Sequence, residues 1–326
     1  MANIDWMPDH FGDGFEMTYV NHPEDYSGKI KSTVIRKRTQ HPTGKAMLYV
    51  HGFSDYFLQK DMALMFAERG YDFYAVDLRK YGRSLIQGQK MFQVRDLREY
   101  FPDIDSAIDI IAGDGSDRIA LLGHSTGGLT ASLYMAGQPS HLVKVLMLNS
   151  PFLDWNMPWL MKKGMVPLVS ALGKWFPDVR VHQKPDSSYA ETLSNRYEGE
   201  WEYNAEWKPD VLPDPDMGWI HAIQSGQKRL RRQRVNVPVL LMHSSASVNK
   251  GDPKEKYFRA DAILDVESIS RYGKRLGEDV TEVSFEGGLH DLALSKKAIR
   301  EKMYHTMLAW LHDKMPRKPY VKISIS

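Results

Sequence analysis

The feature that most constrains the fold is a serine between two glycines in residues 118–128, which run RIALLGHSTGG. Residues 119–122 form a short apolar run that is typical of a buried parallel strand, and the small and apolar residues after Ser125 indicate a helix. A strand that turns directly into a helix exposes this serine at the edge of a sheet. Gly123 and Gly127 remove the Cβ atoms that would collide there. The stretch therefore predicts a nucleophilic serine on a strained turn.

A serine hydroxyl is a weak nucleophile at neutral pH and needs a base, which in turn needs an orienting carboxylate. Where a serine occupies such a turn, its partners follow in the chain order serine, acid, histidine, each after a later strand. Residues 280–285 alternate like a final strand, and residues 297–311 indicate a closing amphipathic helix. His290 lies on the glycine-flanked loop between them. The order predicts His290 as the base for Ser125.

The orienting acid has three candidates. Residues 237–243 form the preceding apolar strand, but the polar segment after it carries no carboxylate before Asp252. Asp261 is followed by a small residue and then by apolar ones, which is typical of a loop that re-enters the fold. Its spacing to His290 leaves room for one helix and one strand. We favour Asp261 as the acid, with Asp265 and Asp252 as alternatives.

A further apolar strand ends at residues 51–53, His-Gly-Phe. The tetrahedral oxyanion of acyl transfer needs two preorganised backbone N–H donors. We expect one from Thr126, at the start of the helix after the serine. We expect the other from Phe53, because Gly52 lets the backbone approach closely.

Four motifs together resemble the α/β-hydrolase superfamily, in particular its monoacylglycerol lipase, lysophospholipase and serine-aminopeptidase-like branch. The motifs are His51-Gly52-Phe53, Asp77-Leu78-Arg79-Lys80-Tyr81-Gly82-Arg83-Ser84, Gly123-His124-Ser125-Thr126-Gly127 and His290-Asp291-Leu292. The resemblance covers roughly residues 40–150 and 236–312. It implies a Ser-His-Asp hydrolase, chiefly of carboxylic esters, with no metal or organic cofactor. It also implies the triad and oxyanion donors named above.

Strand and helix patterns alternate after residue 40, which predicts an α/β fold with a doubly wound, mostly parallel sheet. Residues 13–39 predict two antiparallel strands at its edge. Because residues before 150 and after 236 belong to one sheet, we expect the core to comprise residues 1–150 and 236–326. Residues 151–235 are then an inserted, largely helical cap.

The predicted cap carries apolar residues at three- and four-residue steps, which indicates amphipathic helices. Large aromatic residues on a segment that leaves the sheet above Ser125 favour a lid over an apolar acyl pocket. We expect Trp159 and Trp201 to line that pocket. A contact between residues 155–176 and a lipid surface is a further hypothesis. The basic run 228–234 is typical of the solvated end of a helix.

Composition narrows the class of protein. The 326 residues carry a formal net charge of +2, which implies no strong attraction to nucleic acid or to anionic membranes. The lack of cysteine excludes disulfides, thiol nucleophiles and cysteine-ligated metals. No signal-peptide core follows the first residues and no stretch is long and apolar enough to span a bilayer, so a cytoplasmic location is expected.

The leading hypothesis is a serine hydrolase that acts through an acyl-enzyme on small-molecule esters, from short acyl esters to monoacylglycerol or lysophospholipid. An aminopeptidase-like serine peptidase is the alternative, with Glu198, Glu200 and Glu202 as candidate anchors for a substrate amine. A non-catalytic ligand-binding member of the fold is a third hypothesis. The sequence leaves acyl length and oligomeric state open.

Overall fold

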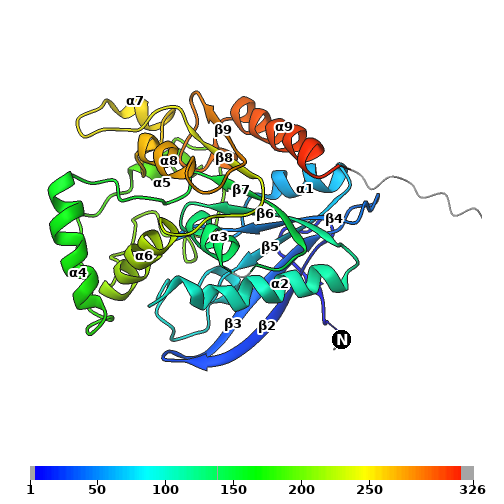
Figure 1. Cartoon of the computed structure of the whole chain (residues 1–326), viewed down its shortest axis with the longest axis horizontal. Helices are drawn as coiled ribbons and strands as arrows, with labels where there is room; N and C mark the ends of the chain where they lie inside the picture. Colours follow the sequence, from blue (N-terminus) through cyan, green and yellow to red (C-terminus); the bar gives the residue numbers. More distant parts are fainter. Residues whose placement is uncertain (1–3, 138, 317–326) are drawn as a thin grey trace, which may run out of the picture.

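The computed structural model describes residues 4–137 and 139–316, and these form one sheet of nine strands with helices on both faces (Figure 1). The strands are β1 (Met7–Pro8), β2 (Phe15–Asp25), β3 (Gly28–Lys37), β4 (Lys45–Val50), β5 (Tyr71–Asp77), β6 (Arg118–His124), β7 (Val143–Asn149), β8 (Val239–Ser244) and β9 (Val280–Phe285). Their spatial order is β1-β2-β3-β5-β4-β6-β7-β8-β9. Pairs up to β3–β5 are antiparallel and all later pairs are parallel. The predicted antiparallel edge on a mostly parallel sheet is confirmed.

The described helices cover both faces of the sheet. They are α1 (Lys60–Glu68), α2 (Phe101–Gly113), α3 (Thr126–Ala136), α4 (Val166–Gly173), α5 (Ser188–Leu193), α6 (Met217–Leu230), α7 (Lys254–Tyr257), α8 (Val266–Gly273) and α9 (Lys297–Lys314). Helices α2, α3 and α8 pack on one face, and α1 and α9 pack on the other. None of these helices is long and apolar enough to cross a membrane.

The central strands are apolar on both sides because helices cover both faces of a parallel sheet. In β4, every residue is buried. Leu48 belongs to the core beneath α2 and α3, whereas its neighbour Tyr49 belongs to the core beneath α1 and α9. The continuous apolar runs of the sequence are therefore the strands that separate two hydrophobic cores.

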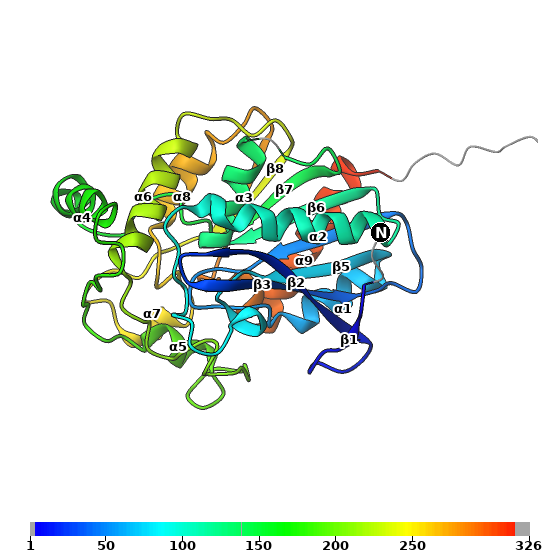
Figure 2. The same ribbon diagram turned by 90° about the horizontal axis from the view of Figure 1, so that it is seen from below.

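The chain between β7 and β8 leaves the sheet and forms α4, α5 and α6. Helix α6 contacts α3, and α4 packs against the outer side of α6. Both views show α4 projecting from the body of the molecule, with α6 between it and the sheet (Figure 1, Figure 2). This segment contains the residues that we expected to form a cap, and the domain boundaries at 150 and 236 stay a prediction.

The motif at residues 77–84 holds the loop after β5 by buried charges. Asp77 accepts hydrogen bonds from the backbone N–H of Phe57 at 2.8 Å and from the guanidinium of Arg83 at 2.8 Å. The same guanidinium donates to Asp9 at 2.7 Å, which ties the N-terminal segment to this loop. Arg83 and both carboxylates are buried. This part of the motif therefore stabilises the fold, through contacts that do not include Ser125.

We predict that Arg83→Met lowers the free energy of unfolding by about 3–5 kcal/mol, because Asp9 and Asp77 would stay buried without their shared cation. Denaturant unfolding of the purified variant measures the change. Arg98→Ala is the matched control, since Arg98 is exposed beside Asp96 and its loss should cost less than about 1 kcal/mol. Equal losses in the two variants would contradict this role for Arg83.

Candidate active site

Ser125 occupies a sharp turn between β6 and α3. Its φ is +52° and its ψ is −117°, a left-handed backbone conformation that is strained for a residue with a side chain. A Cβ on Gly123 would lie 2.6 Å from the carbonyl oxygen of Gly127, and a Cβ on Gly127 would lie 2.2 Å from that of His51. The two glycines are therefore required by close approach of the backbone. This is the turn that the sequence predicts.

The structure brings Ser125, His290 and Asp261 together. The Nε2 atom of His290 lies 3.0 Å from the Oγ atom of Ser125, and its Nδ1 atom lies 2.9 Å from Asp261 Oδ2. All three side chains are buried. The second oxygen of Asp261 accepts the backbone N–H groups of Ile263 and Leu264, both at 2.8 Å, and these bonds fix the carboxylate. The geometry suits an Nδ1–H that donates to Asp261 and an Nε2 that accepts from the serine hydroxyl.

The other two candidates for the acid have different contacts. Asp265 caps the N-terminus of α8 and accepts from the hydroxyl of Ser268 at 2.6 Å. Asp252 pairs with Lys256 at 2.7 Å on the surface. Of the three aspartates, Asp261 is the one that contacts His290.

Residues that sequence reasoning missed hold the loop of His290. The next residue, Asp291, accepts from the side chains of Asn149 at 2.7 Å and Gln59 at 2.8 Å, and from the backbone N–H of Ala293 at 2.9 Å. Its own N–H donates to the hydroxyl of Tyr189, which comes from α5. The only sequence signal for this support is the position of Asp291 beside the histidine.

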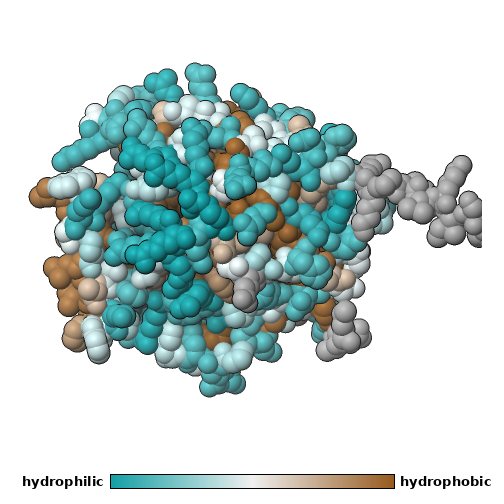
Figure 3. Space-filling model, in the orientation of Figure 1, coloured by the Kyte–Doolittle hydropathy of each residue, from teal (hydrophilic) through white to brown (hydrophobic). Residues whose placement is uncertain are grey.

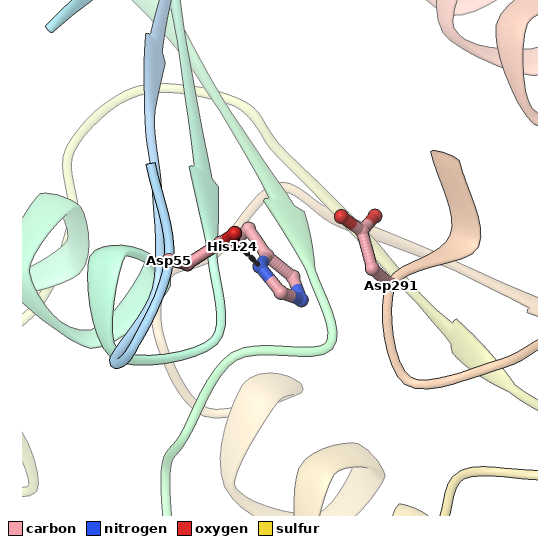
Figure 4. Close-up of side chains that lie close together, drawn as sticks. All are labelled: Asp55, His124 and Asp291. Carbon is pink, nitrogen blue, oxygen red and sulfur yellow. Dashed lines mark ion pairs between the residues drawn. The ribbon is translucent and has the colours of Figure 1, made fainter. Parts of the chain in front are cut away.

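Asp55, His124 and Asp291 are the one group of described residues whose ligand atoms, within 4.8 Å of one another, could hold a metal ion (Figure 4). The hydrogen bonds and ion pairs of these three residues argue against a metal site. The ammonium of Lys208 lies 2.9 Å from Asp55, and N–H donors already occupy both oxygens of Asp291. Burial lowers the pKa of His124, but the charges of Asp291 and Asp55 outweigh it and raise this pKa above its ordinary value. The imidazole of His124 thus lies between two carboxylates whose charges favour its protonated form.

A cavity of about 250 Å³ opens above the serine. Ser125 and His290 line it, together with Phe53 and Thr126, the residues expected to supply the oxyanion donors. A Cβ on Gly52 would lie 3.0 Å from the Cβ of Ser125, so the loop after β4 passes close to the serine. The apolar wall consists of Phe152, Trp155, Met157, Leu193, Leu212, Trp219, Ile263 and Leu264.

The two tryptophans that we expected to line the cavity lie outside it. Trp159 is 66% exposed at the start of the helical segment before α4. Trp201 packs beside Leu193 and donates its indole N–H to the carbonyl of Leu294 at 2.7 Å. Trp155 and Trp219 occupy the wall instead. The prediction that Trp159 and Trp201 line the cavity is therefore wrong. The spacing of apolar residues indicated an apolar segment, but it does not tell which of its side chains face the cavity.

The glutamates considered as amine anchors also lie outside the cavity lining. Glu198 pairs with Lys254 at 2.7 Å, and Glu200 pairs with Arg300 at 3.3 Å, both on the surface. Glu202 lines a separate surface hollow. The carboxylates that do line the cavity are those of Asp55, Asp186 and Asp210.

Comparison with known proteins gives three findings. A family profile described as serine aminopeptidase, S33, matches residues 41–296. A Haemophilus influenzae protein named "probable lysophospholipase L2" is 25% identical over 210 residues, which are 61% of this chain and 67% of that protein. Among solved structures, a monoacylglycerol lipase from Paleococcus ferrophilus aligns with a TM-score of 0.63 at 21% identity, covering 86% of this chain and 99% of its own.

A soluble variant of the Saccharomyces cerevisiae monoglyceride lipase, solved with a substrate analogue, has a TM-score of 0.62 at 17% identity. The alignment covers 91% of this chain and 96% of that protein. Likeness at this level of identity concerns the fold. The predicted α/β fold with a mostly parallel sheet is therefore confirmed.

Proposed function

Because the chain belongs to the serine aminopeptidase S33 family of α/β-hydrolases, as its motifs predicted, we propose that it is a serine hydrolase of carboxylic esters. The observation that carries the proposal is the hydrogen-bonded series Asp261–His290–Ser125 at the floor of an apolar cavity. A nucleophile, its base and an orienting acid in this order are the parts that acyl transfer requires.

In the proposed mechanism, Oγ of Ser125 attacks the ester carbonyl while Nε2 of His290 takes the hydroxyl proton. Asp261 holds the Nδ1–H and stabilises the imidazolium that forms. The tetrahedral intermediate collapses to an acyl-enzyme, and His290 gives its proton to the departing alcohol. A water then attacks the acyl-enzyme with the same histidine as base, which releases the acid and restores the serine. Apart from this water, the groups that act in these steps belong to Ser125, His290 and Asp261.

The backbone N–H groups of Phe53 and Thr126 are the proposed oxyanion donors. Both residues line the cavity beside Ser125. Thr126 begins α3, so its N–H belongs to the unpaired first turn of that helix. Donors fixed in the backbone need no reorganisation when the negative charge develops, and each is typically worth several kcal/mol of the barrier.

The cavity supports a substrate with one acyl chain. Aromatic and aliphatic side chains form much of its wall, and polar side chains such as those of Gln183 and Lys208 also reach it. Such walls bind hydrocarbon and offer few partners to a peptide. A relative named as a lysophospholipase and neighbours named as monoacylglycerol lipases agree with this class, so we propose a monoacyl ester as substrate.

A peptidase of the aminopeptidase type is the second candidate, favoured by the family description. It needs a free carboxylate for the substrate amine, but the cavity carboxylates have other contacts. Asp55 pairs with Lys208, and Asp210 accepts from Arg196 at 2.7 Å and Tyr203 at 3.1 Å. Asp186 accepts the N–H of Ser188 in an exposed loop. Hydrolysis of an ester is therefore the better-supported reaction.

We expect Ser125→Ala to abolish ester hydrolysis and labelling by a fluorophosphonate, because no other group can form the acyl-enzyme. Loss of one hydroxyl should leave the fold intact, which thermal unfolding checks. A variant that keeps most of the wild-type turnover would refute the proposed nucleophile.

Asp261→Asn should reduce kcat about 10⁴-fold by analogy with the protease triad, because the amide favours the wrong imidazole tautomer. Asp252→Asn is the matched control and should change kcat little, since Asp252 pairs with Lys256 on the surface. Steady-state kinetics on a short aryl ester measure both. A loss of kcat confined to the Asp252 variant would assign the role of the acid to Asp252 instead.

For the cavity wall, kcat/KM should rise with acyl length until the cavity is full, by up to about fourfold for each buried methylene. Trp219→Ala enlarges the cavity and should shift the optimal acyl length to longer chains. Trp159→Ala should leave the optimal length unchanged, because Trp159 is exposed outside the cavity. A series of aryl esters of increasing length tests this. An identical profile in all three proteins would mean that the cavity does not select the acyl chain.

A further inference from the structure

A second cavity, of about 200 Å³, lies where the end of α6 meets the end of α8. Three arginines line it together with a few other side chains: Arg231, Arg234 and Arg275, with Leu153, Gln227, Leu230, Tyr272 and Leu276. We name it the arginine cavity. Two of its arginines belong to the basic run 228–234, and the third follows α8. Figure 3 shows hydrophilic side chains gathered over the part of the molecule where α6 and α8 lie in Figure 1.

The positive charge of the arginine cavity is only partly neutralised by the described part of the chain. Arg231 pairs with Asp154 at 2.6 Å, and Asp154 also pairs with Lys162 at 2.8 Å. Arg234 and Arg275 pair with no carboxylate that the structure describes, and no described carboxylate lines the cavity. The C-terminal ends of α6 and α8 favour cations, but each end carries only about half a negative charge. The two unpaired arginines therefore leave positive charge available for an anion.

Neighbouring groups orient the guanidinium groups at the cavity. The guanidinium of Arg231 lies over the ring of Tyr272, with 4.4 Å between its central carbon and the ring centre. Arg234 uses one nitrogen, Nη1, to donate to the carbonyl of Gln233 at 2.9 Å. Each guanidinium has five N–H donors in a planar fork, so most donors of Arg234 stay available. Such a fork matches two oxygens of a phosphate or a carboxylate at once.

The cavity also has an apolar side. Leu153, Leu230 and Leu276 are buried and line it, and the half-buried ring of Tyr272 lies beside them. Concave sites that combine apolar walls with a few polar groups bind a carbon group and fix its orientation. An occupant that fits both parts carries an anionic group and a carbon group.

We propose that the arginine cavity binds an organic phosphate monoester. The phosphate lies between Arg234 and Arg275, and the carbon group lies against Tyr272 and the leucines. A phosphate monoester carries a charge of about −1.5 to −2 near pH 7 and offers three strong acceptor oxygens. It therefore matches two unpaired guanidinium groups better than a carboxylate, which carries a single charge.

The arginine cavity is separate from the catalytic cavity, because the two share no lining residue. They are nevertheless adjacent along the chain, since Phe152 lines the catalytic cavity and Leu153 lines the arginine cavity. Gln227 donates to the carbonyl of Phe152 at 3.0 Å, and the N–H of Phe152 donates to the carbonyl of Ser125 at 2.9 Å. The occupant thus lies near the backbone of the serine without reaching its hydroxyl. It is a ligand other than the substrate, and this proposal does not rest on the proposed function.

A nucleic-acid strand is the alternative source of phosphate, and it fits this region less well. A strand presents phosphate diesters along an extended line, so it needs a row of available cations. In the basic run 228–234, Arg229 pairs with Asp96 and Arg231 pairs with Asp154. The available arginines instead surround a small concave site with an apolar side, which favours a small phosphate monoester.

Calorimetric titration of the full chain with phenyl phosphate at neutral pH tests the proposal. We expect one site per chain. Inorganic phosphate and benzoate should each bind at least about tenfold more weakly, because the first lacks the carbon group and the second lacks the second charge. Arg234→Gln and Arg275→Gln should each weaken phenyl phosphate at least about tenfold. Arg232→Gln is the matched control, since it removes the same charge from an arginine outside the cavity lining, and it should change the affinity less than about twofold.

Variants of the catalytic cavity show which cavity is occupied. Ser125→Ala and Trp219→Ala should bind phenyl phosphate as the wild type does, and Arg275→Gln should keep the melting temperature of the unliganded chain. Absence of phenyl phosphate binding by the wild-type chain would overturn the proposal, whatever the chain does to esters. Equal weakening by Arg232→Gln and Arg275→Gln would overturn it in favour of a diffuse basic surface of the kind that binds nucleic acid. Weakening by Trp219→Ala alone would overturn it by placing the ligand in the catalytic cavity.

Discussion

The strained backbone of Ser125 is the constraint on which the site depends. A side-chain-bearing residue in this conformation costs about 1–3 kcal/mol and persists only where its surroundings enforce it. Here the N–H of Ser125 donates to the carbonyl of Asn149 at 3.0 Å, and its carbonyl accepts from Phe152 at 2.9 Å. Asn149 ends β7, which pairs with β6, so the sheet register holds the serine in place. The same asparagine binds Asp291 beside the histidine, and the two halves of the site are therefore positioned by one residue.

The parallel sheet explains why residues so far apart in sequence meet. Parallel strands end at one edge, so the loops after β4, β6, β8 and β9 converge there. Those loops carry Phe53, Ser125, Asp261 and His290, each after its own strand. The polar insertion after β8 does not disturb this order, because the backbone of Asp261 pairs with residues 246–248 and returns the carboxylate to the sheet edge. The four residues therefore meet because their strands lie in chain order across the sheet, and no sequence motif has to link them directly.

How far a contact reaches along the chain decided whether the sequence could predict it. The parallel sheet and its antiparallel edge were predictable, because apolar runs and glycine turns are properties of a few adjacent residues. Asp261 had to be weighed against two other aspartates, since its contact with His290 depends on how a loop closes. The supports Gln59 and Asn149 escaped prediction because each acts across the fold on Asp291. The tryptophan assignment failed because the apolar pattern of residues 151–235 does not tell which of its side chains face the cavity, and Trp155 and Trp219 are the ones that do.

The formal charge of the whole chain does not describe the charge of any one of its surfaces. A formal net charge of +2 for the whole chain predicts little attraction to anionic membranes, yet that sum averages over 43 basic and 41 acidic residues. Electrostatic attraction acts over roughly one Debye length, about 8–10 Å at physiological salt, so a docking surface responds to its own charges rather than to the total. Residues 155–177 carry three lysines beside two exposed tryptophans, with Asp154 and Asp178 directly before and after them. Local charge and exposed apolar side chains can therefore differ from the average of the chain, and here they do so in the segment that also walls the cavity above Ser125.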